Sequence, residues 1–175
     1  LVGSEMCIRD RYQRAADQGN ADAKFGLAQM YGRGKTKSDN LRKDDKLALK
    51  LYKEAAAEGH EMSWALLSHI YETGSNGEEK NEVVAACWNR KAADKGSRSA
   101  QWRLARMYEE GRGVDQNYVE ARLCYEKAAA QDDSYSQASL AKMYRSGRGG
   151  PRNEKLALQL FHQAAEAGDS NAQFE

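Results

Sequence analysis

Pairs of adjacent alanines recur along this chain at a nearly constant spacing. The pairs are Ala15-Ala16, Ala55-Ala56, Ala92-Ala93, Ala128-Ala129 and Ala164-Ala165. The last three pairs lie 36 residues apart, and the two earlier steps are 40 and 37 residues. Self-similarity at a fixed period of about 20–50 residues is typical of proteins that stack one structural unit repeatedly. The chain is therefore expected to be an array of repeats, an architecture that commonly presents an extended binding surface.

Each repeat has room for two helices. A column of tyrosines, each followed three residues later by a glycine, consists of Tyr31, Tyr71, Tyr108 and Tyr144. Residues 99–110 lead through one of these tyrosines and place apolar side chains at helical spacing, and residues 118–131 form a second apolar stripe around an alanine pair. No segment alternates polar and apolar residues as a strand would. The sequence predicts an all-α solenoid of stacked antiparallel helix pairs without strands.

Residues suited to helix ends mark the expected boundaries. The first helices are expected to start after Asn20, His60, Ser97, Asp133 and Asp169, and the second helices after Asp44, Asn81, Asn117 and Asn153. All except the histidine have short side chains that accept hydrogen bonds from the first turn of a helix. The glycine that follows each tyrosine can adopt the left-handed conformation that closes a helix.

The third unit carries the most complete motif. Gly111-Arg112-Gly113-Val114 is followed by Asn117, Ala121, Cys124-Tyr125 and Lys127-Ala128-Ala129. This pattern resembles the Sel1-like repeat, a 36-residue relative of the tetratricopeptide repeat, and the resemblance extends over residues 12–175. It implies a right-handed superhelix of helix pairs. Two loops depart from the pattern: residues 34–43 contain about four extra residues, and residues 74–77 contain one.

The period divides the chain into segments. Residues 12–19 are expected to be the second half of an incomplete repeat, residues 20–59, 60–96, 97–132 and 133–168 to be four complete repeats, and residues 169–175 to start another. Residues 1–10 fit no repeat and resemble a translated sequencing-library adapter, so residues 1–11 are expected to be a non-native tail. We expect the chain to be the middle of a longer array whose N-terminus, signal peptide and attached domains lie outside it.

Composition and spacing argue against several classes of function. Charged residues make up 30% of the chain and the formal net charge is +1, unlike a strongly basic nucleic-acid-binding protein. No apolar run approaches the roughly 18 residues that a membrane span needs. The three histidines have no partner at metal-ligand spacing. Asp44-Asp45 and Asp132-Asp133 lie at expected helix starts, where acidic side chains stabilise the helix. We expect no catalytic residue, metal or cofactor.

Cysteine usage bears on one alternative function. Some cysteine-rich relatives of the Sel1-like repeat join the two helices of each repeat by a cysteine pair and have been described as hydrolases of β-lactams. Outside the first ten residues this chain has only Cys87 and Cys124, in different repeats. The sequence therefore predicts two buried thiols and no disulfide framework.

The resemblance implies that the first helix of each repeat lines a concave face. The candidate partner-binding residues lie seven, five and two residues before the column tyrosines, and they are Lys24, Gln29, Trp64, His69, Gln101, Arg103, Arg106, Gln137 and Lys142. Trp64 aligns with polar residues and is expected to be exposed, whereas Trp88 and Trp102 are expected in the core. An exposed tryptophan near arginines would suit an acidic or aromatic-containing peptide, because aromatic and arginine side chains are favoured interface anchors.

These observations favour a non-catalytic scaffold that binds a protein or peptide along the concave face, without nucleic acid and without membrane insertion by this segment. Two alternatives stay open. One is a hydrolase such as the β-lactamase activity described for cysteine-rich relatives, and the other is a regulatory array fused to a domain outside this segment.

Overall fold

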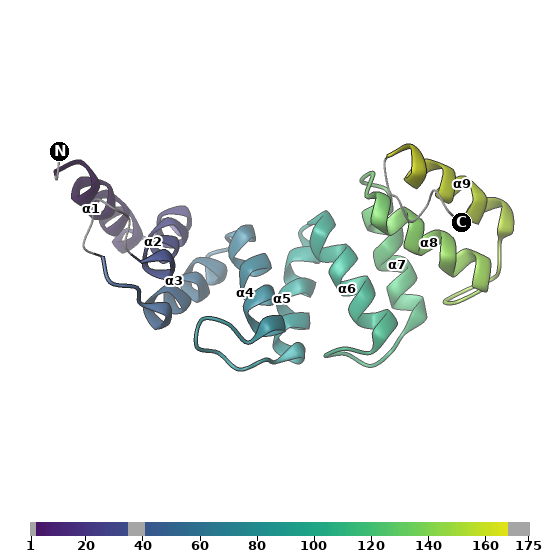
Figure 1. The fold of residues 1–175 in the computed structure, drawn as a ribbon, viewed down its shortest axis with the longest axis horizontal. Coiled ribbons are helices and arrows are strands. Elements are labelled where there is room, and N and C mark those ends of the chain that lie inside the picture. The colour runs from purple at the N-terminus through teal and green to yellow at the C-terminus, as the bar shows by residue number, and fades with distance from the viewer. Residues whose placement is uncertain (1–2, 35–40, 168–175) are drawn as a thin grey trace. The chain divides into compact units, whose positions relative to one another are not determined.

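The computed structural model describes residues 3–34 and 41–167, with side chains from residue 8 onward. The described residues form helices and turns, and none of them forms a strand (Figure 1). The helices are α1 (Gly3–Asp17), α2 (Ala21–Arg33), α3 (Asp45–Ala57), α4 (Glu61–Thr73), α5 (Glu82–Asp94), α6 (Arg98–Glu110), α7 (Tyr118–Ala129), α8 (Ser134–Ser146) and α9 (Glu154–Glu166). The predicted all-α repeat solenoid is confirmed, and its right-handed sense stays a prediction.

The helices form two compact units, Leu1–Asn81 and Glu82–Glu175. In the first unit, α2 packs against α1 and α3, and α3 packs against α4. In the second unit, α5 to α9 pack in succession. The most extensive contacts join α2 to α3, α6 to α7 and α8 to α9, which are the two helices of one predicted repeat in each case. The boundary between the units falls between the two helices of the predicted repeat 60–96.

Helix α1 crosses the expected junction between tail and repeat at residues 11 and 12. The side chain of Tyr12 lies against α2 at Gly26, where an added Cβ atom would come within 2.6 Å of the tyrosine ring. Residues 35–40, which make up most of the loop 34–43 with its predicted extra residues, and the predicted repeat start at residues 169–175 lie outside the described part of the chain.

Small side chains hold the helices of each repeat close together. One alanine of every pair is essentially inaccessible, as at Ala55 and Ala128, both 0% exposed. A second alanine column inside the second helices is also buried, and it contains Ala48, Ala85, Ala121 and Ala157. A methyl group lets two backbones approach, and large side chains such as Leu27, Leu67 and Met107 then fill the remaining space.

Most of the predicted helix caps form the expected hydrogen bonds. The side chain of Asn20 accepts from the amide of Ala23 at 2.8 Å, and Asp133 accepts from that of Ser136 at 2.9 Å. His60 also acts as a cap, with its Nδ1 atom 3.2 Å from the amide nitrogen of Ser63. The expectation was wrong for Ser97, whose side chain makes no capping hydrogen bond.

The loop after each first helix of the second unit packs on the previous repeat. Gly113 has a φ of +67°, and a Cβ atom there would lie 2.1 Å from the carbonyl oxygen of Glu82 at the start of α5. Gly149 has a φ of +73°, and its Cβ atom would lie 2.2 Å from the carbonyl oxygen of Tyr118 at the start of α7. The second glycine of the Gly-x-Gly motif is thus required by both its backbone conformation and its close approach to a neighbouring helix.

Candidate functional site

Four candidate partner-binding residues lie seven positions before the column tyrosines. The structure places this column inside the fold, although a partner-binding column is expected to be exposed. Trp64 is only 6% exposed, and its indole Nε1–H donates to the carbonyl oxygen of Ala56 at 2.9 Å. Gln101 is buried and donates in the same way to the carbonyl oxygen of Ala93 at 3.3 Å. The last carbonyls of a helix have no partner within that helix, so these side chains satisfy the end of the preceding second helix.

The other two members of this column are also held within the fold. Gln137 is buried at 7% exposure. Lys24 bonds to Glu58, and its ammonium nitrogen lies 3.7 Å from Glu54. The expectation of an exposed Trp64 was therefore wrong, because the structure uses this column for packing and hydrogen bonding.

The inward position of Trp64 leads to a stability prediction. Trp64→Phe removes the N–H that bonds to the buried carbonyl of Ala56, and it is expected to destabilise the chain by about 1–2 kcal/mol. Urea unfolding followed by circular dichroism measures this loss. In the absence of urea, where the variant is folded, its affinity for a peptide should be unchanged. Weakened peptide binding at unchanged stability would contradict the packing role of Trp64 and support its original assignment to the partner-binding face.

The column two residues before the tyrosines does reach the surface. His69 and Lys142 are exposed, and Gln29 and Arg106 are half-buried. Arg103, from the column five residues before the tyrosine, is half-buried as well. The structure brings Gln29 and His69 together in the first unit, and places the three cationic residues on α6 and α8 of the second unit.

Gln29 and His69 line a groove of about 550 Å³ between the first helices α2 and α4. Its lining consists of Phe25, Gln29, Gly32, Arg33, Tyr52, Met62, Ala65, Leu66, His69 and Asn76. The ring of Phe25 packs 5.5 Å from that of Tyr52 and 4.4 Å from that of His60, measured between centroids. Met62 is 61% exposed although it is large and apolar. Apolar walls with a few polar groups are typical of sites that bind peptides or small molecules.

The corresponding helices of the second unit carry an aromatic surface. Trp102 on α6 and Tyr135 on α8 have ring centroids 6.3 Å apart and planes inclined by 56°. Tyr135 is 60% exposed, and Trp102 is half-buried. The guanidinium of Arg106 lies 5.1 Å from the centre of the Trp102 ring and 2.8 Å from a carboxylate oxygen of Glu110. The expectation that Trp102 belongs to the core is met only in part, because the residue packs against the core cluster but is half-buried. Trp88, which was also expected in the core, is half-buried as well.

Hydrogen bonding fixes the charge state of this surface. The pKa of Arg106 is raised, mainly by its hydrogen bond to Glu110. Burial opposes ionisation of Glu110, but hydrogen bonds from Arg106 and Arg112 outweigh it and lower the pKa of that carboxyl group. Both groups are therefore charged at neutral pH.

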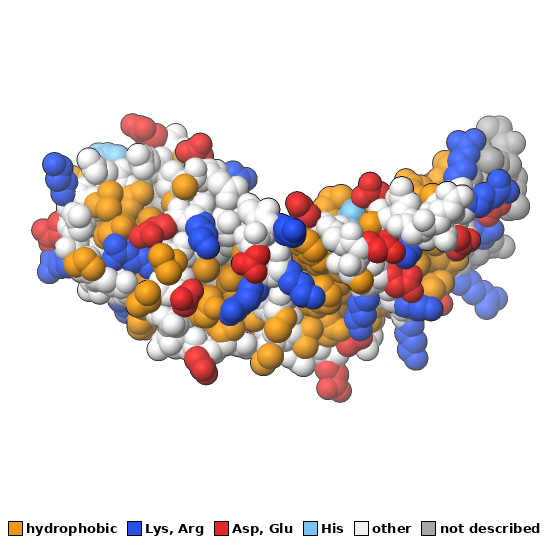
Figure 2. All heavy atoms as spheres, turned by 180° about the vertical axis from the view of Figure 1, so that it is seen from behind, with side chains coloured by type: hydrophobic (Ala, Val, Ile, Leu, Met, Phe, Trp, Pro, Cys, Tyr) orange, Lys and Arg blue, Asp and Glu red, His pale blue; other side chains and the backbone are white. Residues whose placement is uncertain are grey.

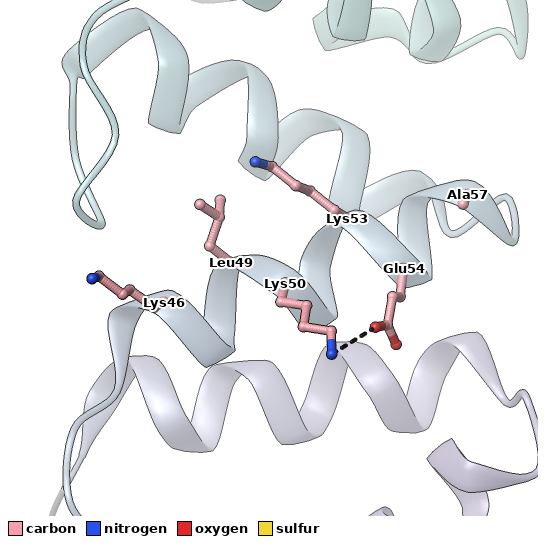
Figure 3. Close-up of a pocket in the computed structure, with 6 residues that line it drawn as sticks. All are labelled: Lys46, Leu49, Lys50, Lys53, Glu54 and Ala57. Atoms are coloured by element: carbon pink, nitrogen blue, oxygen red, sulfur yellow. Dashed lines mark ion pairs between the residues drawn. The ribbon is translucent and has the colours of Figure 1, made fainter.

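The chain contains further surface features away from the first helices. A pocket of about 460 Å³ lies on α3. It is lined by Lys46, Leu49, Lys50, Lys53, Glu54 and Ala57 (Figure 3). Two of its cations form intramolecular ion pairs, Lys50 with Glu54 at 3.9 Å and Lys53 with Glu78 at 3.1 Å. This pocket is therefore a weaker candidate for binding an anionic partner, because its charges are already compensated.

The second helices of the second unit also expose apolar side chains. These are Val83, Val119, Leu123 and Leu158, between 45% and 61% exposed. Val119 and Leu123 form part of a pocket of about 280 Å³ that Pro151 closes on one side. Figure 2 shows apolar patches interrupted by charged side chains on one side of the molecule. The second-helix surface is the main rival to the first-helix surface as a docking site.

Chemistry-bearing clusters are scarce among the described residues. Within residues 3–34 and 41–167, no three His, Cys, Asp or Glu side chains are close enough to hold a metal ion. No helix in the part of the chain that was searched is long and apolar enough to cross a membrane. Cys124 is buried as predicted, and burial raises the pKa of its thiol. Cys87 is exposed, contrary to the prediction, and both cysteines are free.

Comparison with known proteins identifies the repeats. The family model described as Sel1 repeat matches residues 12–20, 21–60, 65–97, 98–133 and 134–169. The chain belongs to the Sel1 repeat family. The Sel1 matches begin and end within a few residues of the predicted repeats.

Relatives of this Sel1 repeat protein come from bacteria and yeast. A chitin synthase regulator of Saccharomyces cerevisiae is 33% identical over 116 residues, which are 66% of this chain and 16% of the regulator. A protective antigen of uropathogenic Escherichia coli has a similar structure, with a TM-score of 0.83, 29% identity, and coverage of 94% of this chain and 34% of the antigen. A Sel1 repeat protein of Oxalobacter formigenes has a TM-score of 0.78 and 30% identity, with coverage of 93% and 46%. The chain therefore spans less than half the length of each of these proteins.

The two surfaces with large exposed side chains recur after every second Sel1 repeat, and the sequence shows the same alternation. Six residues before the tyrosine the column reads Phe25, Ala65, Trp102 and Ala138, and nine residues before it the column reads Asp22, Met62, Ser99 and Tyr135. A large ring in one Sel1 repeat thus meets a large exposed side chain from the next, once in each unit. This alternation of large and small residues is visible in the sequence, and it is the signal that could have located both sites.

Proposed function

We propose that this chain is a non-catalytic scaffold that binds a peptide or protein partner on the surfaces of its first helices. These surfaces are formed by α2 and α4 in one unit and by α6 and α8 in the other. The observation that carries the proposal is the pair of large exposed side chains, Met62 and Tyr135, each beside an aromatic ring of the neighbouring first helix. Exposed apolar side chains that gather beside polar groups are typical of interaction sites.

The groove between α2 and α4 suits an extended segment of a partner. Phe25, Met62 and Leu66 offer apolar contact, and the side chains of Gln29 and Asn76 can exchange hydrogen bonds with a peptide backbone. A volume of about 550 Å³ lies within the range of sites that hold small ligands, so it can accommodate side chains of a peptide. Affinity would then depend on a few buried anchors rather than on the total contact area.

A peptide selection with matched variants tests this proposal. A random 12-residue library displayed on phage is selected against the whole chain, and the affinities of the enriched peptides are measured. We expect Met62→Glu or Tyr135→Glu to weaken binding of different peptides by roughly tenfold or more, because each puts a charge into an apolar contact. Val119→Glu and Leu158→Glu are the controls, since these side chains are similarly exposed on second helices. A library without enrichment, or peptides sensitive only to the control variants, would contradict the proposal.

The yeast relative supports a regulatory setting for such a scaffold. It is a chitin synthase regulator, and the matched segment is a small part of it. A repeat array that brings a partner to a domain elsewhere in a longer protein is consistent with the scaffold proposal. The hydrolase alternative has no comparable support, because the two free cysteines lie in different repeats. Hydrolysis of a chromogenic β-lactam by the purified chain, abolished by one substitution, would establish that alternative instead.

A further inference from the structure

We propose that the surface of α6 and α8 recognises an acidic peptide segment that carries one aromatic or large aliphatic side chain. The inference rests on the proposed scaffold function and specifies the partner of one of its two surfaces. Three observations carry it: the charge of these helices, the way their acidic residues are engaged, and the geometry of Trp102, Tyr135 and Arg106.

The first helices of the two units differ in charge. α6 and α8 together contain five basic residues and two acidic ones, a net charge of +3. α2 and α4 contain two basic residues and three acidic ones, a net charge of −1 when His69 is neutral. The basic residues of α6 and α8 are Arg98, Arg103, Arg106, Lys142 and Arg145. Among the first helices the positive charge is therefore concentrated on α6 and α8, where Arg98 is also paired with Asp133 at 3.8 Å, just before α8 begins.

Neighbouring groups from outside α6 and α8 engage both acidic residues. Glu109 accepts a hydrogen bond from the hydroxyl of Tyr125 at 3.0 Å and lies 3.7 Å from Arg148. Glu110 bonds to Arg112 in addition to Arg106. These two carboxylates are partly neutralised by the following loops, so they only partly offset the field of the arginines and the lysine. This positive field would attract the carboxylates of a partner, so the partner would associate faster and dissociate more slowly.

The aromatic pair supplies a contact for an apolar side chain. The rings of Trp102 and Tyr135 are inclined by 56°, and part of their surface is accessible to a third group, because Tyr135 is 60% exposed and Trp102 is half-buried. Arg106 lies over the Trp102 ring, and its Nε and one Nη donate to Glu110. A carboxylate of a partner would bind the remaining N–H groups at the end of the planar guanidinium. An aromatic or aliphatic side chain against the rings, with an acidic residue next to it, would match both features of the surface.

A peptide fits these features better than a nucleic acid does. Binding to a phosphate backbone uses a continuous basic stripe that contacts several successive phosphates. Here Arg106 lies directly against the aromatic pair, whereas Arg98 pairs with Asp133 and Arg145 lies over Phe161. The first helices of the other unit carry a net negative charge. Single-stranded nucleic acid is nevertheless the competing ligand class, because bases stack on aromatic rings. The test therefore includes an oligonucleotide.

Defined ligands test the inference on the whole chain. The probe is a fluorescent pool of 12-residue peptides in which six Asp or Glu residues surround one Trp, Phe or Leu at varied positions. In a second pool the acids are replaced by Asn and Gln, in a third the large side chain is replaced by Ser, and the fourth ligand is a twelve-nucleotide oligothymidylate. We expect the acidic pool to bind at least tenfold more tightly than the other three and to weaken as salt is added. Equal binding of the neutral pool, or tighter binding of the oligonucleotide, would overturn the inference.

Variants assign the binding to this surface. Arg103→Glu combined with Arg106→Glu, and separately Tyr135→Ser, are expected to weaken binding of the acidic pool by at least tenfold. Lys46→Glu combined with Lys50→Glu is the control for the charge change, and Leu158→Ser is the control for loss of an equally exposed apolar side chain. If the double glutamate variant does not fold, Arg103→Gln with Arg106→Gln replaces it, and an unchanged affinity of that variant overturns the inference.

The outcome also separates this inference from the scaffold proposal. Library peptides that depend on Met62 or Tyr135 without any preference for acidic residues would refute the inference and leave the scaffold proposal standing. Failure of the library to yield any peptide dependent on either surface would refute the scaffold proposal itself.

Discussion

Gly113→Ala is expected to destabilise the second unit by about 3 kcal/mol and to lower the midpoint of thermal unfolding by roughly 5–10 °C. Two costs add at this position. The φ of +67° is unfavourable for a residue with a side chain, and the new Cβ atom would lie 2.1 Å from a backbone oxygen and 2.3 Å from the carbonyl carbon of Glu82. Those atoms belong to the start of α5, so relief requires a shift of the whole loop. Thermal unfolding followed by circular dichroism measures the effect.

Gly77→Ala is the matched control for the backbone conformation. Its φ is +80°, but nothing lies within 4 Å of the position of an added Cβ atom. The control should therefore show the conformational cost alone, about 1 kcal/mol. Equal destabilisation by both substitutions would show that the approach of the loop to Glu82 contributes nothing. The account of the Gly-x-Gly motif as a contact between repeats would then be wrong.

Tyr125→Ala is expected to cost about 3–5 kcal/mol, which is typical of removing a large aromatic ring from a core. Tyr125 is 1% exposed and lies in the core cluster formed by α6 to α9. Burial raises the pKa of its hydroxyl group, so the side chain stays neutral and donates to Glu109 at 3.0 Å. Chemical denaturation with urea, followed by far-ultraviolet circular dichroism, measures the loss.

Tyr125→Phe separates the ring from its hydroxyl group. The equivalent residue one repeat later is Phe161, which is also buried, so a phenyl ring suits this column. The Phe variant should lose only the hydrogen bonds of the hydroxyl group, to Glu109 and Ser139, about 1–2 kcal/mol in total. A Phe variant as unstable as the Ala variant would show that these hydrogen bonds, and not the ring, hold this part of the second unit together.

Much of the fold could be predicted because the period, the small-residue columns and the caps all depend on local sequence. Alanine pairs mark where two helices must approach, and residues such as Asn20 and Asp133 mark where helices begin. These features act over a few residues and repeat several times. Agreement among repeats then compensates for departures, such as the extra residues in the loops 34–43 and 74–77.

The surface could be predicted less well, and the tryptophans show why. Trp64 shares a column with Gln101 and Gln137, and polar neighbours suggested exposure. The column is in fact buried, because its members can donate hydrogen bonds to carbonyls at the end of the preceding helix. Trp102 was expected in the core, although it is half-buried. Which side of a helical column faces the neighbouring repeat depends on packing angles that residue spacing does not encode.

The central claim is that partners bind the first helices and not the second. A photo-crosslinking amino acid placed in turn at Met62, Tyr135, Val119 and Leu158 tests it, since these four side chains are between 55% and 61% exposed. The peptides from the library selection are the ligands, and mass spectrometry locates each crosslink. We expect crosslinks from positions 62 and 135 and at most background from positions 119 and 158. Crosslinks that arise mainly from positions 119 and 158 would contradict the claim and would place the binding surface on the second helices.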